Sequence, residues 1–147
     1  MKTITETSRL YLRELTPDDA QSFYALNADP EVIRYTGDAA FDSVMAARDF
    51  LTSYIAVYAQ FKRGRWAVIR KSDGEFLGWC GLKYHPEENI TDLGFRFFRQ
   101  FWNQGYATES AAACLHYGFN NLALTEIHGH AMAANKASVR VLEKLGF

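Results

Sequence analysis

The chain has 147 residues, of which 48% are hydrophobic and 22% are charged, and its formal net charge is −1. This length predicts a single domain over residues 1–147 with one buried core. Because the net charge is close to zero and every apolar run is short, we expect no nucleic-acid partner, no membrane partner and no signal peptide. We therefore expect a cytoplasmic protein.

The two cysteines, Cys80 and Cys114, each lie inside an apolar segment and have no CxxC partner. Isolated cysteines of this kind usually behave as small buried residues, so we expect reduced thiols rather than a disulfide or a metal site.

The first part of the chain predicts one strand and three helices. Alternating leucines predict a strand over residues 8–15. Thr16-Pro17-Asp18-Asp19 is typical of a helix start, and this helix should run to about residue 28. Asp29-Pro30-Glu31 repeats the signal and predicts a short second helix. Apolar residues three or four apart then predict a long helix over residues 44–61.

The second part changes to a period of two and then alternates strands with helices. Three consecutive strands joined by polar turns predict an antiparallel meander. The later strand, helix and strand require a parallel crossover. The predicted elements are strands over 66–69, 76–84 and 91–98, a helix over 108–121, a strand over 126–132, and a helix that begins after Asn135 and ends at Gly146.

These elements predict an α+β fold (mixed α/β). We expect a mixed sheet with an antiparallel meander, one right-handed βαβ crossover between the strands near residues 95 and 129, and helices on both faces. A ligand cleft is expected where the strand order of an open sheet changes, which is at this junction.

The segment over residues 95–107 lies at that junction and has the pattern of an anion site. An aromatic strand passes through Trp102-Asn103-Gln104-Gly105-Tyr106-Ala107 into a helix. The first N–H groups of a helix have no intrahelical partners, and Gly105 with the small Ala107 would let a phosphate approach them. A glycine in such a turn can also have a purely steric purpose, so the pattern alone leaves both interpretations open.

Six motifs occur along the chain in a fixed order. They are TSRLYLR at residues 7–13, TPDDA at 16–20, DPEV at 29–32, DLGF at 92–95, WNQGYATE at 102–109 and NKASVRVLEKLGF at 135–147. Together they resemble the GNAT acetyltransferase family, and within it the branch of ribosomal-protein serine and alanine N-terminal acetyltransferases. The resemblance covers the whole chain and implies an enzyme that uses acetyl-CoA as co-substrate.

The resemblance also implies where acetyl-CoA binds. In this family the glycine turn wraps the pyrophosphate with backbone N–H groups, and the preceding strand pairs its main chain with the pantetheine arm. An asparagine at the position of Asn135 holds the pantetheine where the two central strands splay apart, although a helix cap explains Asn135 equally well. The implied cofactor-binding residues are Leu93, Phe95, Phe97, Asn103, Gln104, Gly105, Tyr106, Ala107, Thr108 and Asn135.

Acetyl transfer needs a neutral amine, a polarised thioester carbonyl and a proton for the departing thiolate. The resemblance offers a backbone N–H near Phe95 for the carbonyl. Many relatives supply the proton from a tyrosine, but Leu142 stands at that position, so Ser138 is the candidate acid. Asp92 is the candidate base, although an α-amine is partly neutral at pH 7 and needs no side-chain base.

His128 and His130 share one face of the strand predicted over residues 126–132. Two such histidines could bind zinc, but no third ligand stands at a suitable spacing. We therefore expect structural histidines and no metal.

The acceptor implied by the resemblance is a primary amine, either a protein N-terminus, which we favour, or a small molecule. We expect direct transfer in a ternary complex and a monomer or homodimer. Because Leu142 replaces the tyrosine, a non-catalytic CoA-binding or regulatory module is the alternative. Relatives continue past Leu-Gly-Phe with two more strands, so we expect this sequence to lack the last two strands of the domain.

Overall fold

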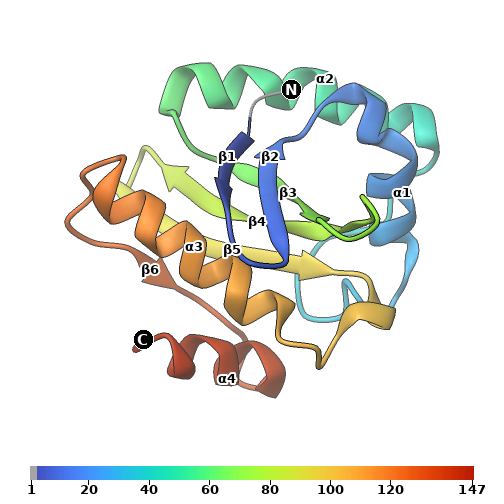
Figure 1. Cartoon of the computed structure of the whole chain (residues 1–147). Coiled ribbons are helices and arrows are strands. Elements are labelled where there is room, and N and C mark those ends of the chain that lie inside the picture. Colours follow the sequence, from blue (N-terminus) through green and yellow to red (C-terminus); the bar gives the residue numbers. More distant parts are fainter. Residues whose placement is uncertain (1–2) are drawn as a thin grey trace.

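The computed structural model describes residues 3–147, and its centre is a six-stranded sheet (Figure 1). The strands follow one another across the sheet in chain order. Neighbours from β1 to β5 are antiparallel, whereas β6 is parallel to β5. The predicted mixed sheet with one parallel crossover is therefore confirmed. The strands are β1 (Thr3–Glu6), β2 (Leu10–Glu14), β3 (Arg65–Arg70), β4 (Phe76–His85), β5 (Ile90–Phe97) and β6 (His128–Gly129).

Four α-helices in the described part of the chain cover the two faces of this sheet (Figure 1). Trp79 of β4 packs in one core with residues of α1 and α2, whereas the neighbouring Cys80 packs in a second core with α3. Successive strand residues point to opposite faces, so β4 contributes to both cores. The helices are α1 (Ala20–Ala28), α2 (Val44–Phe61), α3 (Tyr106–Asn120) and α4 (Lys136–Lys144).

Among residues 3–147, no helix has both the length and the apolar character that crossing a bilayer requires.

The long helix α2 has the predicted bounds, Val44–Phe61. Ser43 caps its start, because the Ser43 Oγ accepts the Ala46 N–H at 3.0 Å. Lys62 adopts a left-handed conformation with φ of 60° and ends the helix. The apolar stripe that predicted α2 buries Leu51 and Tyr58 against the sheet.

The short helix predicted after Asp29 is wrong. Residues 30–36 form turns joined by isolated backbone hydrogen bonds, such as the Thr36 N–H to the Ile33 carbonyl at 3.1 Å. The Asp29 carboxylate accepts the Glu31 N–H at 3.0 Å and pairs with Arg99 at 2.9 Å. The side chain that was expected to start a helix therefore closes a local turn instead.

Two strands also differ from the predicted pattern. β1 was not predicted because Thr3-Ile4-Thr5-Glu6 contains one apolar residue, and its strand conformation comes from pairing with β2. The strand predicted over residues 126–132 pairs with β5 at His128 and Gly129. After Gly129 the chain moves away from β5, and this separation opens the candidate site.

Candidate active site

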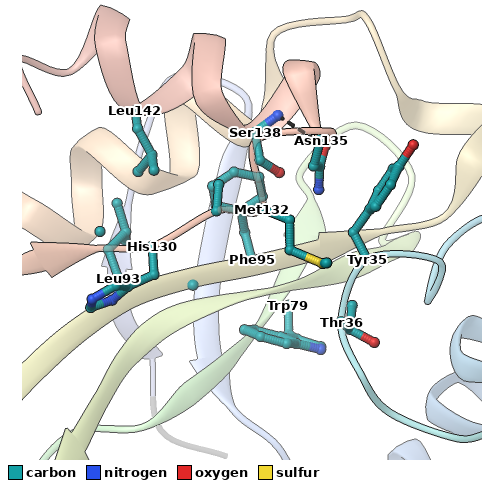
Figure 2. Close-up of a pocket in the computed structure, with 13 residues that line it drawn as sticks. Tyr35, Thr36, Trp79, Leu93, Phe95, His130, Met132, Asn135, Ser138 and Leu142 are labelled. Carbon is teal, nitrogen blue, oxygen red and sulfur yellow. Dashed lines mark hydrogen bonds between the residues drawn. The ribbon is translucent and has the colours of Figure 1, made fainter.

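A cleft of about 630 Å³ opens where β5 and β6 separate (Figure 2). β5 forms one wall, α4 and the segment before it form the opposite wall, and the α1–α2 connection contributes to the rim. This volume is typical of small-molecule sites. The residues that line the cleft are Tyr35, Thr36, Trp79, Leu93, Gly94, Phe95, Gly129, His130, Ala131, Met132, Asn135, Ser138 and Leu142.

The edge of β5 that faces the cleft offers backbone groups to a ligand. β5 pairs with β4 from Ile90 to Phe97, whereas its pairing with β6 ends at Leu93. Within the described chain, the β6-facing groups of residues 94–97 therefore have no strand partner. An extended ligand can hydrogen-bond to such an edge in the way that an additional strand would.

Asn135 and Ser138 stand on the α4 wall of the cleft (Figure 2). The Asn135 Oδ1 accepts the Ser138 backbone N–H at 3.3 Å and so caps α4. Because the carbonyl oxygen makes this cap, the amide nitrogen of Asn135 points toward β5 and remains available to a ligand. The sequence presented the cap and ligand contact as alternatives, but the two ends of one amide can do both.

Gly129 keeps α4 close to the sheet beside this wall. A Cβ atom at Gly129 would lie 2.8 Å from the Leu142 Cδ2 and 3.0 Å from the Phe147 ring. These contacts are so close that a larger residue at position 129 would displace the Leu142 and Phe147 side chains, and glycine allows α4 to pack directly on β6.

The N-terminus of α3 has the features of an anion site. Gly105 precedes the helix with φ of 83°, and no side chain caps the helix there. The N–H groups of Tyr106, Ala107 and Thr108 fall in the first turn, where the helix itself provides no acceptors. A residue other than glycine would be strained at position 105. The predicted turn therefore fits a phosphate group chemically.

Arg9 lies beside this turn, a position that no sequence pattern predicted. Its Nη2 donates to the Gln104 carbonyl at 3.2 Å, and its guanidinium lies 4.4 Å from the centre of the Tyr106 ring. The Arg9 Nε also donates to the Glu109 carboxylate at 2.7 Å. Burial alone would raise the pKa of Glu109, but hydrogen bonds from Thr7 and Arg9 outweigh it and hold that pKa below its usual range.

Asp92 lies between two histidines at the edge of the cleft. Its Oδ2 is 2.8 Å from the His85 Nε2, and its Oδ1 is 3.0 Å from the His130 Nδ1. His130 lines the cleft, whereas Asp92 stands behind it. Among residues 3–147, no three His, Cys, Asp or Glu side chains are placed to hold a metal ion.

The structure brings some of the predicted site residues together and separates others. Leu93, Phe95, Asn135 and Ser138 all line the cleft, whereas the predicted cofactor residues Asn103, Gln104 and Gly105 form an exposed turn at the start of α3. The side chains of Phe97 and Tyr106 are buried in the core, so these two residues could contribute backbone groups to a ligand. Ala107 and Thr108 are partly buried in the first turn of α3.

Several lining residues were not predicted as site residues: Tyr35, Thr36, Trp79, His130 and Met132. Tyr35 and Thr36 come from the irregular α1–α2 connection, where no sequence periodicity indicates which side chains face the cleft. His130 and Met132 belong to the segment that leaves the sheet after β6, which the sequence predicted as regular strand.

The arrangement suits an extended ligand that carries phosphate at one end and a reactive group at the other. An uncapped helix N-terminus follows β5 in the chain, and the free edge of the same strand leads into the cleft. The residues present therefore fit acetyl-CoA.

Comparison with known proteins agrees with this interpretation. The model of the acetyltransferase (GNAT) domain matches residues 9–147. The N-acetyltransferase YoaA of Bacillus subtilis is 34% identical over 146 residues, which cover 98% of this chain and 82% of YoaA. A GNAT-family acetyltransferase structure from Bacillus anthracis has 26% identity and a TM-score of 0.82, over 99% of this chain and 82% of the other.

Two more distant structures share the fold. The spermidine N-acetyltransferase of Vibrio cholerae, in complex with CoA and spermine, has 20% identity and a TM-score of 0.80 over 95% of this chain and 81% of its own. RimL, a ribosomal L7/L12 α-N-protein acetyltransferase in complex with coenzyme A, has 15% identity and a TM-score of 0.83 over 99% of this chain and 84% of RimL.

The family model covers nearly the whole chain, and the fold, the splayed strands and the uncapped α3 N-terminus agree with it. The chain belongs to the GNAT acetyltransferase family and is an N-acetyltransferase that uses acetyl-CoA.

Proposed function

We propose that this enzyme acetylates the α-amine of a peptide or protein N-terminus by direct transfer from acetyl-CoA. The observation that supports this acceptor is the chemistry of the cleft. Among the described residues that line it there is no Asp, Glu, Lys or Arg. Its polar side-chain groups are the hydroxyls of Tyr35, Thr36 and Ser138, the Asn135 amide, the His130 imidazole and the Trp79 indole N–H.

A lining without carboxylates favours an acceptor that carries one amine. A polyamine brings further ammonium groups, and each would need an anionic partner when it leaves water. A peptide N-terminus continues as neutral amides, which hydroxyl and amide groups can bind. The pKa of an α-amine, about 8, is also below that of a lysine-type amine, about 10.4, so a larger fraction is neutral at pH 7.

The rim of the cleft leaves room for the rest of a peptide. Thr36 and Met132 are exposed on opposite sides of the opening, and Met132 has 57% of its surface accessible. The names of the fold neighbours include both acceptor classes, since one is a spermidine acetyltransferase and another acts on a protein α-amine. The acceptor proposed for this chain therefore depends on its own cleft.

The proposed acetyl-CoA contacts combine the two features of the site. The pyrophosphate would bind the turn and first helical residues from Asn103 to Thr108, where N–H groups lack partners within the helix. The pantetheine would pair with the free edge of β5 at Phe95 and Phe97, because the expected partner Leu93 already pairs with Gly129 of β6, and the Asn135 amide nitrogen would hold it from the opposite wall.

The proposed chemistry uses both walls of the cleft. The amine nitrogen attacks the thioester carbonyl, which a backbone N–H of β5 near Phe95 polarises. The C–N bond forms, the C–S bond breaks, and CoA leaves as a thiolate. The Ser138 hydroxyl gives the thiolate a proton, and Asp92 assists removal of the proton from the amine.

Direct transfer is supported by the position of the cysteines, which would be the nucleophiles of an acetyl-enzyme. Cys80 and Cys114 are free, fully buried and 3.6 Å apart between β4 and α3. Burial also raises the pKa of the Cys114 thiol. An acetyl group found on either cysteine during turnover would contradict direct transfer.

Mass spectrometry of an amine panel tests the acceptor class. The protein is incubated with acetyl-CoA and a peptide that has a free N-terminus and no lysine, the same peptide blocked at its N-terminus and carrying one lysine, spermidine, or a small aromatic amine. We expect the highest kcat/KM for the free α-amine. A higher value for spermidine or for the lysine peptide would contradict the proposal, and a higher value for the aromatic amine would indicate a small-molecule enzyme.

A further inference from the structure

Three titratable side chains meet at one wall of the cleft: His85 at the end of β4, Asp92 in β5, and His130 just after β6. The two carboxylate oxygens of Asp92 are shared between the histidines, at 2.8 Å from the His85 Nε2 and 3.0 Å from the His130 Nδ1. Of the three, only His130 lines the cleft, whereas His85 and Asp92 are partly buried behind it.

His130 is the member of the cluster that an acceptor can reach. Its side chain has 70% of its surface exposed and lines the cleft near Leu93 (Figure 2). The side chain of Asp92 is 23% exposed, and its Oδ1 atom is buried. A proton acceptor must come within hydrogen-bonding distance of the amine. The His130 imidazole lines the cleft and can approach an amine there, whereas Asp92 is not among the lining residues.

The position of Asp92 also determines which nitrogen of His130 is free. A carboxylate beside Nδ1 favours the proton on that nitrogen, which leaves the lone pair of Nε2 for another partner. Within residues 3–147 the Asp92 Oδ1 accepts no hydrogen bond of good geometry, so it has capacity for this N–H. His85 holds the other carboxylate oxygen and fixes the orientation of the group.

The neighbouring His128 provides a contrast. Its ring is stacked on that of His130, with an interplanar angle of 6° and 6.2 Å between the centroids. The His128 Nε2 contacts Glu126, however, and His128 lines a separate depression at the other end of β5 with Arg63 and Thr91. The two histidines thus face different surroundings, and His130 is the more exposed of the two and the one in the cleft.

We propose that His130 is a catalytic residue that accepts the proton of the attacking amine, and that Asp92 positions it. This proposal rests on the proposed amine acetylation. As the amine nitrogen bonds to the acetyl carbon and the C–S bond breaks, one proton passes from nitrogen to the His130 Nε2. The resulting imidazolium lies against the Asp92 carboxylate, and the thiolate takes its proton from Ser138, which regains one from water. His130 later releases its proton to water.

The charged and titratable groups that face His130 come from several elements. Asp92 belongs to β5, His85 to β4, and His128 with Glu126 to the segment around β6, while Tyr35 belongs to the α1–α2 connection on the rim. A change in pH acts on this whole set. The decisive test therefore varies the acceptor amine at a fixed pH.

The test compares His130→Gln with His128→Gln on two amines that the wild-type enzyme acetylates. One amine is mostly protonated at the assay pH. The other carries fluorine substituents that lower its pKa, so it is mostly neutral. We expect His130→Gln to lower kcat/KM by about 100-fold or more for the protonated amine and by less than about 3-fold for the neutral one. His128→Gln should leave both values within about 2-fold of wild type.

Further measurements separate catalysis from positioning and folding. Imidazole added to the buffer should restore part of the activity of His130→Gln, and Asp92→Asn should show the same dependence on the amine with a smaller loss. Circular dichroism of each variant checks folding. An equal loss for both amines, or no loss, would overturn the role of His130. Failure of the wild-type enzyme to acetylate any peptide amine would instead overturn the proposed function, because the His130 test runs on whichever amine is accepted.

Discussion

At the scale of single residues, Asn135 combines an observed helix cap with a proposed contact to the cofactor. Its Oδ1 caps α4 through the Ser138 N–H, and its amide nitrogen faces β5 across the cleft. A serine at this position keeps an oxygen for the cap but has no amide nitrogen, whereas an alanine has neither. The two substitutions therefore separate the two roles.

We predict that Asn135→Ser and Asn135→Ala both raise the KM for acetyl-CoA about tenfold, which is the effect of one lost hydrogen bond of about 1.4 kcal/mol. Only Asn135→Ala should also lower the free energy of unfolding, by about 1 kcal/mol, because it removes the cap. Steady-state kinetics and urea denaturation measure the two effects. A normal KM for acetyl-CoA in both variants would mean that Asn135 acts only as a helix cap.

At the scale of elements, the turn before α3 is the part of the proposed cofactor site that depends most on backbone conformation. Gly105 has φ of 83°, and a Cβ atom there would lie 3.3 Å from the Arg9 Nη2. Gly74 provides a matched control, since it has φ of 74° in the turn between β3 and β4 and no atom within 4 Å of a built Cβ. The two positions share the strain and differ in their surroundings.

We predict that Gly105→Ala and Gly74→Ala each cost about 1 kcal/mol of stability, because alanine is strained in the left-handed region. Gly105→Ala should in addition raise the Kd for CoA about tenfold, because the new methyl group narrows the approach of the pyrophosphate to the helix N–H groups. Isothermal titration calorimetry with CoA measures this. Equal affinity in the two variants would place the pyrophosphate elsewhere.

Sequence patterns predicted the elements well where local signals and tertiary packing agree. A periodic apolar stripe made α2 predictable to the residue, and the meander followed from period-two segments separated by turns. The helix after Asp29 failed because Asp29 pairs with Arg99, 70 positions away in sequence. β1 was missed because its conformation depends on its partner strand rather than on its own pattern.

The candidate site was predicted only in part, because some of its residues carry local sequence signals and others depend on contacts between distant segments. The glycine turn, Asn135 and Ser138 carry local signals, and the structure places Asn135 and Ser138 in the cleft. His130 was interpreted as structural because the sequence does not indicate that Asp92 lies 3.0 Å from its ring. That contact depends on how far β6 pairs with β5 before the strands separate, which no periodicity specifies.

At the scale of the whole molecule, Glu109 links the N-terminal part of α3 to the segment between β1 and β2. This residue of α3 accepts hydrogen bonds from the Thr7 hydroxyl and from the Arg9 guanidinium and backbone, which precede β2. Because the pKa of Glu109 is lowered in the folded state, the direction in which pH changes its contribution to stability is defined. The stabilisation is complete above the unfolded-state pKa and is lost as the pH falls through the folded-state pKa.

We predict that Glu109→Gln lowers the free energy of unfolding by about 1 to 3 kcal/mol at pH 7, since it removes the charge from several hydrogen bonds. The difference from wild type should shrink as the pH falls below about 4, near the ordinary pKa of a glutamate. Urea denaturation over a pH series measures it, with Glu87→Gln in an exposed turn as control. A difference that does not vary with pH would contradict this role of Glu109.

The molecule as a whole joins an antiparallel meander to one parallel crossover, and the cleft lies where β5 and β6 separate. The central claim is that acetyl-CoA and a peptide α-amine meet in this cleft. A bisubstrate analogue, in which CoA is joined through an acetyl linker to the α-amine of a short peptide, tests it directly by its Kd. We predict binding at least about 100-fold tighter than that of CoA alone, because the linked peptide adds its contacts without a second loss of translational freedom. An analogue that binds no tighter than CoA, or a spermidine analogue that binds tighter than the peptide analogue, would contradict the account.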